Sequence, residues 1–225
     1  IPPFELDTCS YAGKNWSAEN QVLWENDCKT DDHTDAKGSI TIIKDAEPEN
    51  GEDFSFTATN GLEAFLLDDD DDDTLASSKT FSDLEPGDYS ITEVDIEGWQ
   101  LEDISCHSAD ASLVAQDGHT ANLDLHAGEA ITCLFTNTKK GTLRVVKELL
   151  YNDQENENNK LVTDFSFQVN DGESVAFNES GVNEMEVVAG SYTVEELADS
   201  NYMTTYQSGD DDDCEEIIVP AGGVA

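Results

Sequence analysis

The feature that most constrains the fold of this chain is an internal repeat. Gly38–Lys44 (GSITIIK) returns as Gly141–Lys147 (GTLRVVK), and Pro86–Glu93 (PGDYSITE) returns as Ala189–Glu196 (AGSYTVEE). The Lys, Gly, Tyr and Glu landmarks of both pairs shift by the same 103 residues. Landmarks that keep one register indicate two like structural units in series, because each unit of a repeat is one folding motif.

The repeated segments are typical of β-strands. They are short, rich in Val, Ile, Thr, Tyr and Phe, and separated by turn residues such as Gly87 and Gly190. A third pair, Asp53–Phe56 and Asp164–Phe167 (both DFSF), belongs to the same pattern, and helical periodicity is nearly absent. The sequence therefore predicts an all-β fold of tandem immunoglobulin-like or prealbumin-like β-sandwiches.

The repeat also divides the chain into regions. Unit one is expected over residues 37–139 and unit two over residues 140–225. Residues 1–36 match neither unit and are expected to form a small N-terminal cap or loop segment. Unit two ends before the position that corresponds to the last strand of unit one, so we expect it to lack its closing strand.

The net charge of the chain restricts the classes of molecule that it can bind. Of the 225 residues, 51 are Asp or Glu and 10 are Lys or Arg, which gives a formal net charge of -41. Such a chain repels nucleic acid and anionic lipid, and it attracts divalent cations that prefer oxygen ligands. No apolar run is long enough to cross a membrane, so no membrane insertion is expected. Because no P-loop, Gly-x-Ser-x-Gly elbow or His-Glu-x-x-His motif is present, we expect no enzymatic activity.

A set of short motifs resembles a known family. Leu84–Tyr89 (LEPGDY) leads into the strand that ends at Glu93, Gly98–Trp99 follows, and Cys133–Thr138 (CLFTNT) is the expected closing strand. With the Lys-ending first strand, these residues resemble the Cna protein B-type and SpaA-type repeats of bacterial surface adhesins and pilus shafts. The resemblance covers the chain from Lys37 to its C-terminus. It implies a prealbumin-like fold and an extracellular or cell-surface scaffold that bears load or spaces a binding tip.

Three polar residues of unit one are expected at the inner end of its core. Side chains alternate faces along a strand, so Lys44, Glu93 and Asn137 each extend an apolar stripe inward. In the family resembled, the Lys is joined to the Asn by an isopeptide bond with the acid as catalyst. Burial would make the amine neutral and nucleophilic, and would keep the carboxyl protonated so that it polarises the amide carbonyl. The alternative is an ordinary Lys44–Glu93 ion pair at the rim. Unit two offers Lys147 and Glu196 but no Asn.

Five cysteines without a CxxC pair favour disulfides over zinc, and so an oxidising compartment. Cys106 follows a strand and Cys133 lies on the expected closing strand, so we expect these two to pair. Cys9 is expected to pair with Cys28 and to close the N-terminal segment. Cys214 is the unit-two equivalent of Cys106. The Cys106–Cys133 and Cys9–Cys28 pairs leave it as the fifth cysteine, outside both expected disulfides. The alternative is that the cysteines are buried thiols.

Two aspartate runs are candidate calcium sites, since Ca²⁺ takes hard oxygen ligands on flexible loops. Neither run has EF-hand spacing, and the alternative is a solvated loop. The candidate calcium ligands are Asp68, Asp69, Asp70, Asp71, Asp72, Asp73, Asp210, Asp211, Asp212 and Asp213. The fold itself requires no cofactor.

Two asparagines are candidate glycosylation sites. Asn15 and Asn178 each begin an Asn-x-Ser triplet, which has the form of a glycosylation acceptor.

These observations together predict an extracellular structural subunit of a surface filament, pilus or stalk. The alternative is an adhesin module that binds carbohydrate or a partner protein. For that second function, Trp16, Trp24 and Trp99 would supply an aromatic binding platform.

The open end of unit two has two explanations. Either the chain continues past Ala225, or Phe4–Tyr11 of a neighbouring subunit adds as a donor strand. In the second case Cys9 pairs with Cys214 of the next subunit, at the expense of the Cys9–Cys28 pair. That contact is head to tail and would propagate a filament.

Overall fold

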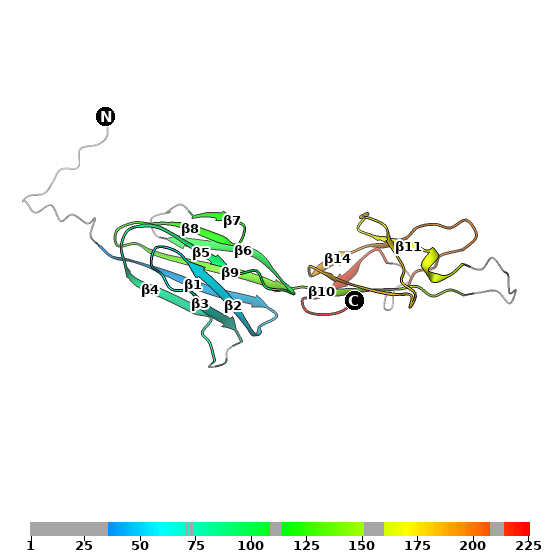
Figure 1. Ribbon diagram of the computed structural model, residues 1–225, viewed down its shortest axis with the longest axis horizontal. Coiled ribbons are helices and arrows are strands. Elements are labelled where there is room, and N and C mark those ends of the chain that lie inside the picture. Colours follow the sequence, from blue (N-terminus) through cyan, green and yellow to red (C-terminus); the bar gives the residue numbers. More distant parts are fainter. Residues whose placement is uncertain (1–35, 71, 73, 109–113, 151–159, 208–213) are drawn as a thin grey trace, which may run out of the picture.

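A computed structural model describes residues 36–70, 72, 74–108, 114–150, 160–207 and 214–225. Apart from one turn of 3-10 helix, the regular elements in these ranges are β-strands, and two β-rich halves lie end to end along the long axis (Figure 1). No helix within these ranges is long and apolar enough to span a membrane. The N-terminal candidates Cys9, Asn15, Trp16, Trp24 and Cys28 lie outside them.

Unit one is a sandwich of two sheets. The strand order is β4-β1-β9-β6 in one sheet and β3-β2-β5-β8-β7 in the other. The first sheet contains β1 (Gly38–Glu47), β4 (Ser78–Leu84), β6 (Trp99–Ser108) and β9 (Ala130–Lys139). The second contains β2 (Asn50–Ala58), β3 (Phe65–Asp69), β5 (Gly87–Glu93), β7 (Val114–Asp117) and β8 (Thr120–Leu125). The first and last strands, β1 and β9, lie side by side and are parallel, whereas the other neighbours are antiparallel.

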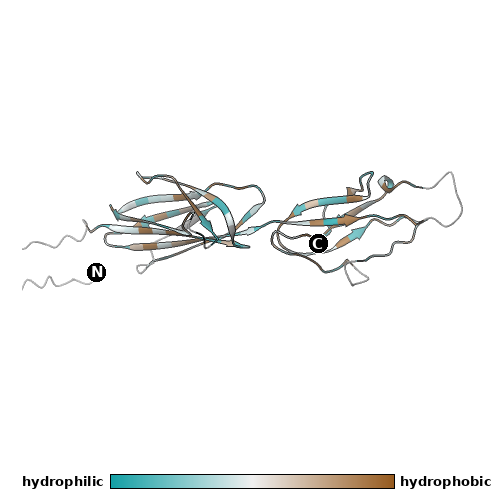
Figure 2. Ribbon diagram, turned by 90° about the horizontal axis from the view of Figure 1, so that it is seen from below, coloured by the Kyte–Doolittle hydropathy of each residue, from teal (hydrophilic) through white to brown (hydrophobic). Residues whose placement is uncertain are grey.

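The core of unit one lies between these sheets. Along β1 the burial alternates, so Ile40, Ile42 and Lys44 point inward while the residues between them are half-buried. Figure 2 shows hydrophobic and hydrophilic residues mixed along the strands of both halves in this way. Phe54 packs edge-on against Trp99, with ring centroids 5.2 Å apart. Each buried Ile or Phe side chain contributes about 1.5–3 kcal/mol by leaving water.

Unit two has shorter strands. They form three small sheets with the orders β10-β13, β12-β11-β15 and β14-β16. Its core is correspondingly small and includes Leu143, Phe165, Phe167 and Val219. The strands are β10 (Gly141–Val146), β11 (Ser166–Val169), β12 (Val175–Ala176), β13 (Val182–Val187), β14 (Gly190–Tyr192), β15 (Val194–Glu196) and β16 (Ile217–Val219).

The two units share their strand pairings. Phe56 lies opposite Glu93 between β2 and β5, and Phe167 lies opposite Glu196 between β11 and β15. In both units a tyrosine hydroxyl donates to the carbonyl four residues earlier, at 2.8 Å from Tyr89 to Glu85 and at 2.6 Å from Tyr192 to Val188. The repeated sequence thus folds into like elements.

The correspondence extends to the parallel pairing of the first strand. In unit one Ser39 lies opposite Ala130, and in unit two Thr142 forms a parallel bridge with Val224. Backbone bonds from Ala225 to Thr142 (3.0 Å) and from Arg144 to Ala225 (2.7 Å) continue this bridge. Residues 223–225 therefore occupy the place in which β9 begins in unit one.

Two local differences separate the units. The strand expected within Ala189–Glu196 is split into β14 and β15, because the backbone N–H of Thr193 donates to the Asn170 side chain at 2.8 Å instead of to a neighbouring strand. The expected strand that begins at Asp164 starts only at Ser166, since Asp164 ends the 3-10 turn η3 (Val162–Asp164).

The junction between the units is a single residue, Lys140, between β9 and β10. Its N–H donates to the Gly98 carbonyl at 2.8 Å, and the N–H of Gly222 donates to the Lys139 carbonyl at 3.1 Å. The Lys140 amine also lies 3.6 Å from a carboxylate oxygen of Glu186. Both units therefore bind the connection, and a connection this short leaves little slack between them.

Candidate functional site

The structure brings Lys44, Glu93 and Asn137 together inside unit one. They lie on β1, β5 and β9, so both sheets contribute to the site. Each of the three residues is 1% exposed. The inward alternation of the strands thus delivers three polar side chains to one end of the core, away from the solvent-exposed rim.

The contacts of Lys44 hold its amine on the Asn137 side chain. The Lys44 Nζ donates to Asn137 Oδ1 at 2.8 Å, to the Phe135 carbonyl at 3.0 Å and to the Asp45 carbonyl at 2.7 Å. It also lies 4.2 Å from the centroid of the Phe54 ring. Neighbouring strands therefore fix the amine against the oxygen of the Asn137 carboxamide.

Glu93 completes the arrangement. The Asn137 Nδ2 donates to Glu93 Oε1 at 2.5 Å, and Glu93 Oε2 lies 4.0 Å from the Lys44 Nζ. Glu93 Oε2 is buried and has no hydrogen-bond partner among the described residues. The carboxyl thus faces the amide nitrogen of Asn137, and not its carbonyl oxygen as the sequence-based mechanism has it.

Burial disfavours the charged forms of both ionisable groups. It lowers the pKa of Lys44 from its ordinary value of 10.5 to about 8, although Glu93, Asp45 and Asp69 oppose the shift. Burial likewise raises the pKa of Glu93, against the opposing effects of Asn137 and Lys44. A neutral amine is a nucleophile and a protonated carboxyl can supply a proton, so the site favours the chemically reactive forms of both groups.

In unit two the corresponding pair is Lys147 and Glu196. The Lys147 Nζ lies 2.7 Å from Glu196 Oε1 and 3.0 Å from Oε2, and 4.6 Å from the Phe165 ring centroid. Thr204 donates to the same carboxylate at 2.9 Å, and the Tyr206 hydroxyl accepts from the Glu196 N–H at 3.1 Å. The contacts of Lys147 in the described ranges include no carboxamide, so this site is an ion pair.

The cysteines of unit one lie on adjacent strands of one sheet. Cys106 on β6 is directly opposite Cys133 on β9, and the structure joins them in a disulfide. Cys214 of unit two is half-buried beside the smaller core, and its carbonyl accepts from the Val194 N–H at 2.9 Å. The disulfide therefore crosslinks β6 to the strand that also carries Asn137.

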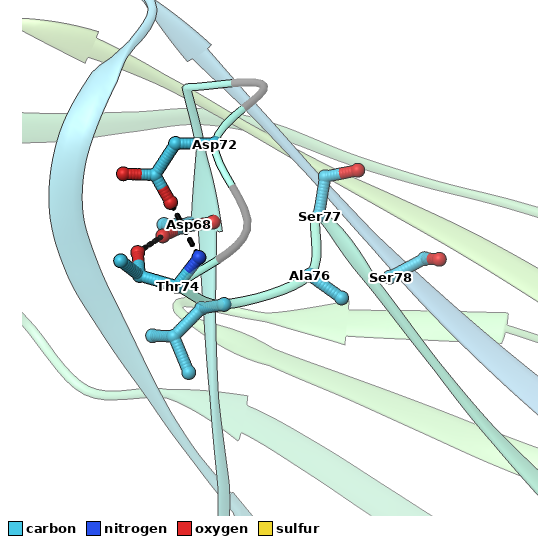
Figure 3. Close-up of a pocket in the computed structure, with 7 residues that line it drawn as sticks. Asp68, Asp72, Thr74, Ala76, Ser77 and Ser78 are labelled. Carbon is cyan, nitrogen blue, oxygen red and sulfur yellow. Dashed lines mark hydrogen bonds between the residues drawn. The ribbon is translucent and has the colours of Figure 1, made fainter.

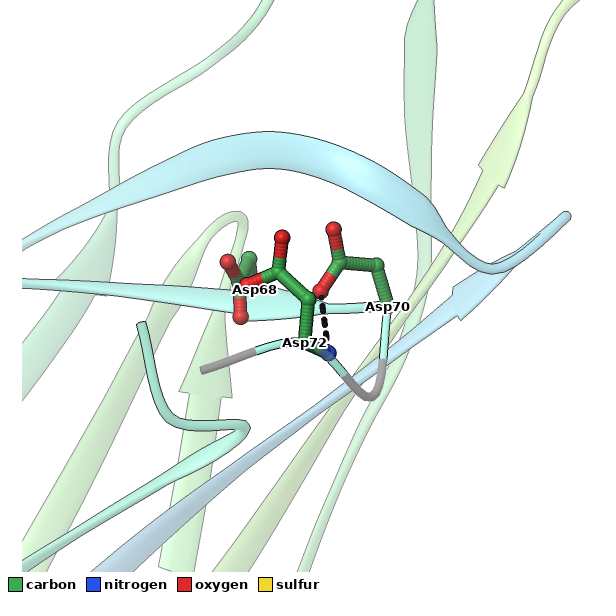
Figure 4. A group of neighbouring side chains, drawn as sticks. All are labelled: Asp68, Asp70 and Asp72. Carbon is green, nitrogen blue, oxygen red and sulfur yellow. Dashed lines mark hydrogen bonds between the residues drawn. The ribbon is translucent and has the colours of Figure 1, made fainter. Parts of the chain in front are cut away.

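The first aspartate run folds so that alternate carboxylates gather. Ligand oxygens of Asp68, Asp70 and Asp72 lie within 4.8 Å of one another (Figure 4). Asp68 is 2% exposed, and burial together with the Asp70 charge raises its pKa. Asp69 points elsewhere, since its Oδ2 accepts from the Ala46 N–H at 2.9 Å. The remaining candidates, Asp71, Asp73, Asp210, Asp211, Asp212 and Asp213, lie outside the described residues.

An open pocket of about 630 Å³ lies beside the aspartates. Figure 3 shows Asp68, Asp72 and Thr74 on one side of it and Ser77 and Ser78 on the other. Thr74 donates from its hydroxyl to Asp68 at 3.3 Å and from its N–H to Asp72 at 2.5 Å. Hydrogen bonds thus tie Thr74 to both aspartates at this side of the pocket.

Two other candidates are placed differently from what their proposed roles need. Trp99 is 3% exposed and packs in the core, so its proposed part in a binding platform is wrong. Asn178 is exposed, but its Nδ2 donates to the Val182 carbonyl and its Oδ1 accepts from the Ser180 N–H at 3.0 Å. A glycan on that nitrogen would have to displace the bond to Val182.

Some contributors to the site were not identified from the sequence. Phe54 was noted as part of a repeated strand, and its period-two spacing to Phe56 could have placed it inward, under the Lys44 amine. Asp69, which fixes the β1 backbone beside Lys44, is hidden among identical neighbours in the aspartate run. No local pattern distinguishes it from the rest of that run.

The comparisons with known proteins agree with this architecture. A family described as a prealbumin-like fold domain, of the SpaA type, matches residues 40–139. No curated protein matches the chain.

Several solved structures are similar to the chain. The Bacillus anthracis TIE protein is 18% identical over 84% of this chain and 33% of its own, with a TM-score of 0.34. A Mobiluncus mulieris adhesin containing intramolecular disulfide, isopeptide and ester bond crosslinks is 15% identical over 45% of this chain and 41% of its own (TM-score 0.34). A streptococcal ancillary pilin is 13% identical over 84% and 61% (TM-score 0.32). The chain spans less than two thirds of each of these proteins. Residues 40–139, which make up most of unit one, have the prealbumin-like fold that this family model describes.

Proposed function

We propose that this chain is an extracellular structural subunit of a surface filament, pilus or stalk, and that unit one locks itself with an isopeptide bond between Lys44 and Asn137. The observation that carries the proposal is the buried contact of the Lys44 amine with the Asn137 carboxamide, 2.8 Å apart, with Glu93 beside both. A water-excluded amine held against an amide is in position for attack.

The reaction balances within these three residues. The lone pair of the neutral Lys44 Nζ forms a bond to the Asn137 Cγ, and the Cγ–Nδ2 bond breaks. The protonated Glu93 gives its proton to the departing nitrogen, which leaves as ammonia, and recovers a proton from the attacking amine. The contact of Glu93 Oε1 with Nδ2 supports this role as proton carrier.

The position of the crosslink suits a protein under tension. The chain enters unit one along β1 and leaves along β9, and these strands are parallel neighbours. Pulling Gly38 and Lys139 apart therefore shears the β1–β9 pairing. A Lys44–Asn137 bond would carry the force directly between the two strands and would exclude the intervening chain, a sequence separation of 93 residues, from the loaded path.

Two finer elements belong to the same proposal. Calcium would bind the Asp68, Asp70 and Asp72 carboxylates, whose oxygens already lie within 4.8 Å of one another.

Subunits would associate head to tail by adding a strand beside β10, which past Arg144 has no parallel partner among the described residues. Non-reducing electrophoresis tests the association. Multimers that collapse on reduction would support Cys9–Cys214 exchange, whereas a strict monomer at all concentrations would contradict it.

The crosslink is tested by the intact mass of the reduced, denatured protein. Condensation of an amine with a carboxamide releases ammonia, so the mass should be about 17 Da below that of the sequence. Lys44→Ala and Asn137→Ala should each restore the full mass, and Glu93→Gln should slow the reaction so that uncrosslinked protein accumulates. Lys147→Ala is the matched control and should keep the deficit. Full sequence mass in the unsubstituted protein would overturn the proposal.

A further inference from the structure

The neighbour of Glu93 across the second sheet is a histidine. β5 and β8 are antiparallel, with Ile91 opposite Ala121 and Thr92 opposite Thr120. The Glu93 N–H donates to the His119 carbonyl at 3.0 Å, so the next pair in the ladder is Glu93 with His119. Directly opposite residues of an antiparallel pair project to the same face, with Cβ atoms about 4.5–5.5 Å apart.

The inward and outward sides of this ladder are set by its other pairs. Ile91 and Ala121 are fully buried, and the hydroxyls of Thr92 and Thr120 meet at 2.8 Å on the opposite face. Because side chains alternate, the imidazole of His119 lies on the inner face with the Glu93 carboxyl. The Gly118–His119 turn between β7 and β8 presents the ring at that end of the core.

Both side chains carry a buried polar atom that lacks a hydrogen bond. These atoms are Nδ1 of His119 and Oε2 of Glu93, and neither has a partner among the described residues. Buried polar atoms are normally paired, and exceptions gather where chemistry takes place. The two atoms form no hydrogen bond with each other, so the imidazole acts on the Glu93 carboxyl through its charge.

We propose that His119 is a positioning residue for the Lys44–Asn137 reaction: its imidazole, beside the Glu93 carboxyl on the inner face, sets whether Glu93 holds the proton that the departing ammonia needs. This inference rests on the proposed crosslinking function and deepens it, because it assigns a regulator to the same site. Histidine is the side chain whose charge ordinarily changes between about pH 5 and 8.

The sign of the effect follows from charge. A protonated imidazole favours the Glu93 carboxylate, which cannot donate, and its charge is among the influences that lower the Glu93 pKa. The other charged groups near the carboxyl are Lys44 across the core and Asp95 just beyond the end of β5. Where the imidazole is charged, it should therefore lower the protonated fraction of Glu93 at that pH and slow crosslinking, and acid also protonates the Lys44 amine.

The test measures crosslinking against pH in the full chain. Protein from cell-free synthesis is collected in denaturant and folded into buffers from pH 5 to 9, and the deficit of about 17 Da is followed over time. In His119→Gln the acid-side fall in rate should be shallower than in the unsubstituted protein, with a rate several-fold higher near pH 5.5. His126→Gln, which alters an exposed histidine at the far end of β8, should follow the unsubstituted profile. A His119→Gln profile identical to that of the unsubstituted protein would overturn the proposal.

A second measurement separates this inference from the proposed function. The ¹³C resonance of the Glu93 carboxyl reports its protonation whether or not a bond forms. In His119→Gln the carboxyl should release its proton at higher pH than in the unsubstituted protein, and in His119→Lys at lower pH. Shifts in these directions in a protein of full mass would retain the influence of His119 on the Glu93 proton and reject the crosslink. Unchanged titration in both variants, with the Cys106–Cys133 disulfide formed as evidence of folding, would reject the role of His119.

Discussion

Lys44 is the residue on which the proposed crosslinking chemistry depends. A buried ammonium is destabilising unless it is compensated, and here the compensation consists of carbonyl oxygens, an aromatic ring and a carboxyl 4.0 Å away. An ordinary structural lysine would be better placed at the surface. The proposed crosslinking reaction would account for this burial, since desolvation makes the amine nucleophilic.

The lowered pKa of Lys44 predicts a pH dependence of stability. Asn137→Ala keeps the amine buried but removes its target. The folded protein releases the Lys44 proton at about pH 8, and the unfolded chain releases it near 10.5. Between these values the unfolded state binds more protons, so the free energy of unfolding should rise with pH. Urea denaturation at pH 8, 9 and 10 measures this slope.

A matched variant identifies the group responsible. Lys44→Met in the Asn137→Ala background removes the amine and keeps a side chain of similar length. The raised pKa of Glu93 acts in the opposite direction, because stability falls with rising pH where a buried carboxyl loses its proton. The Met variant should therefore lose the rise between about pH 8 and 10.5. An equal slope in both proteins would show that Lys44 is not its source.

At the residue scale the sequence was informative because period-two alternation is simple. It predicted that Lys44, Glu93 and Asn137 point inward, and the structure places them in contact. It could not predict which amide atom faces Glu93, because that depends on the rotamer of Asn137 and on the carbonyl of Phe135. The pairing of Glu93 with His119 depends on the register between β5 and β8, which the sequence of either strand alone does not contain.

At the scale of elements, the parallel pairing of first and last strands organises both units. Gly141 begins β10 in a position where a Cβ atom would lie 2.4 Å from Val219 and 2.6 Å from the Pro220 carbonyl. A side chain there must displace the C-terminal segment that runs beside β10. The same crowding occurs in unit one, where a Cβ on Gly38 would lie 2.8 Å from the Glu129 carbonyl.

Gly141→Ala should therefore destabilise unit two. Overpacking of a close backbone approach costs about 1–3 kcal/mol, and the effect should appear as a lower denaturation midpoint. Gly190→Ala is the control, since a Cβ at that position meets nothing within 4 Å and the strand conformation accepts alanine. Equal midpoints for the two variants would mean that the segment beside β10 is not packed as described.

The elements were predicted well where the repeat supplied two copies and poorly where the units diverge. Both Phe-x-Phe strands and both Tyr-containing strands were expected. The break at Thr193 was not, because it results from a hydrogen bond to Asn170, whose proximity is a property of the folded chain. The small core of unit two, with its short strands, also depends on packing that hydrophobic patterns do not specify.

At the scale of the whole molecule, the acidic charge has the largest influence on how stability responds to the solvent. A formal charge of -41 repels itself in the compact state, and cations relieve this repulsion by screening and by binding. We therefore expect the melting temperature to rise with salt and, at constant ionic strength, with calcium. Binding to the native state at 100 times the Kd adds about 2.7 kcal/mol.

Calcium and screening are separated by a triple variant. Asp68→Asn, Asp70→Asn and Asp72→Asn together remove the gathered carboxylates and leave most of the charge in place. The calcium-specific gain in melting temperature should disappear in this variant, while the gain from monovalent salt should remain. If calcium leaves the melting temperature of the unsubstituted protein unchanged, the aspartates are only a solvated acidic segment and the calcium site is rejected.

The central proposal is that a Lys44–Asn137 bond closes unit one covalently. Mechanical pulling of a single molecule by its two ends tests this most directly. Under reducing conditions, Lys44→Ala should release the chain between positions 44 and 137, a separation of 93 residues, or about 330 Å of extension at ~3.6 Å per residue. The unsubstituted protein should release none of this length, because the Lys44–Asn137 bond carries the force. An unsubstituted protein that extends as far as Lys44→Ala would contradict the account.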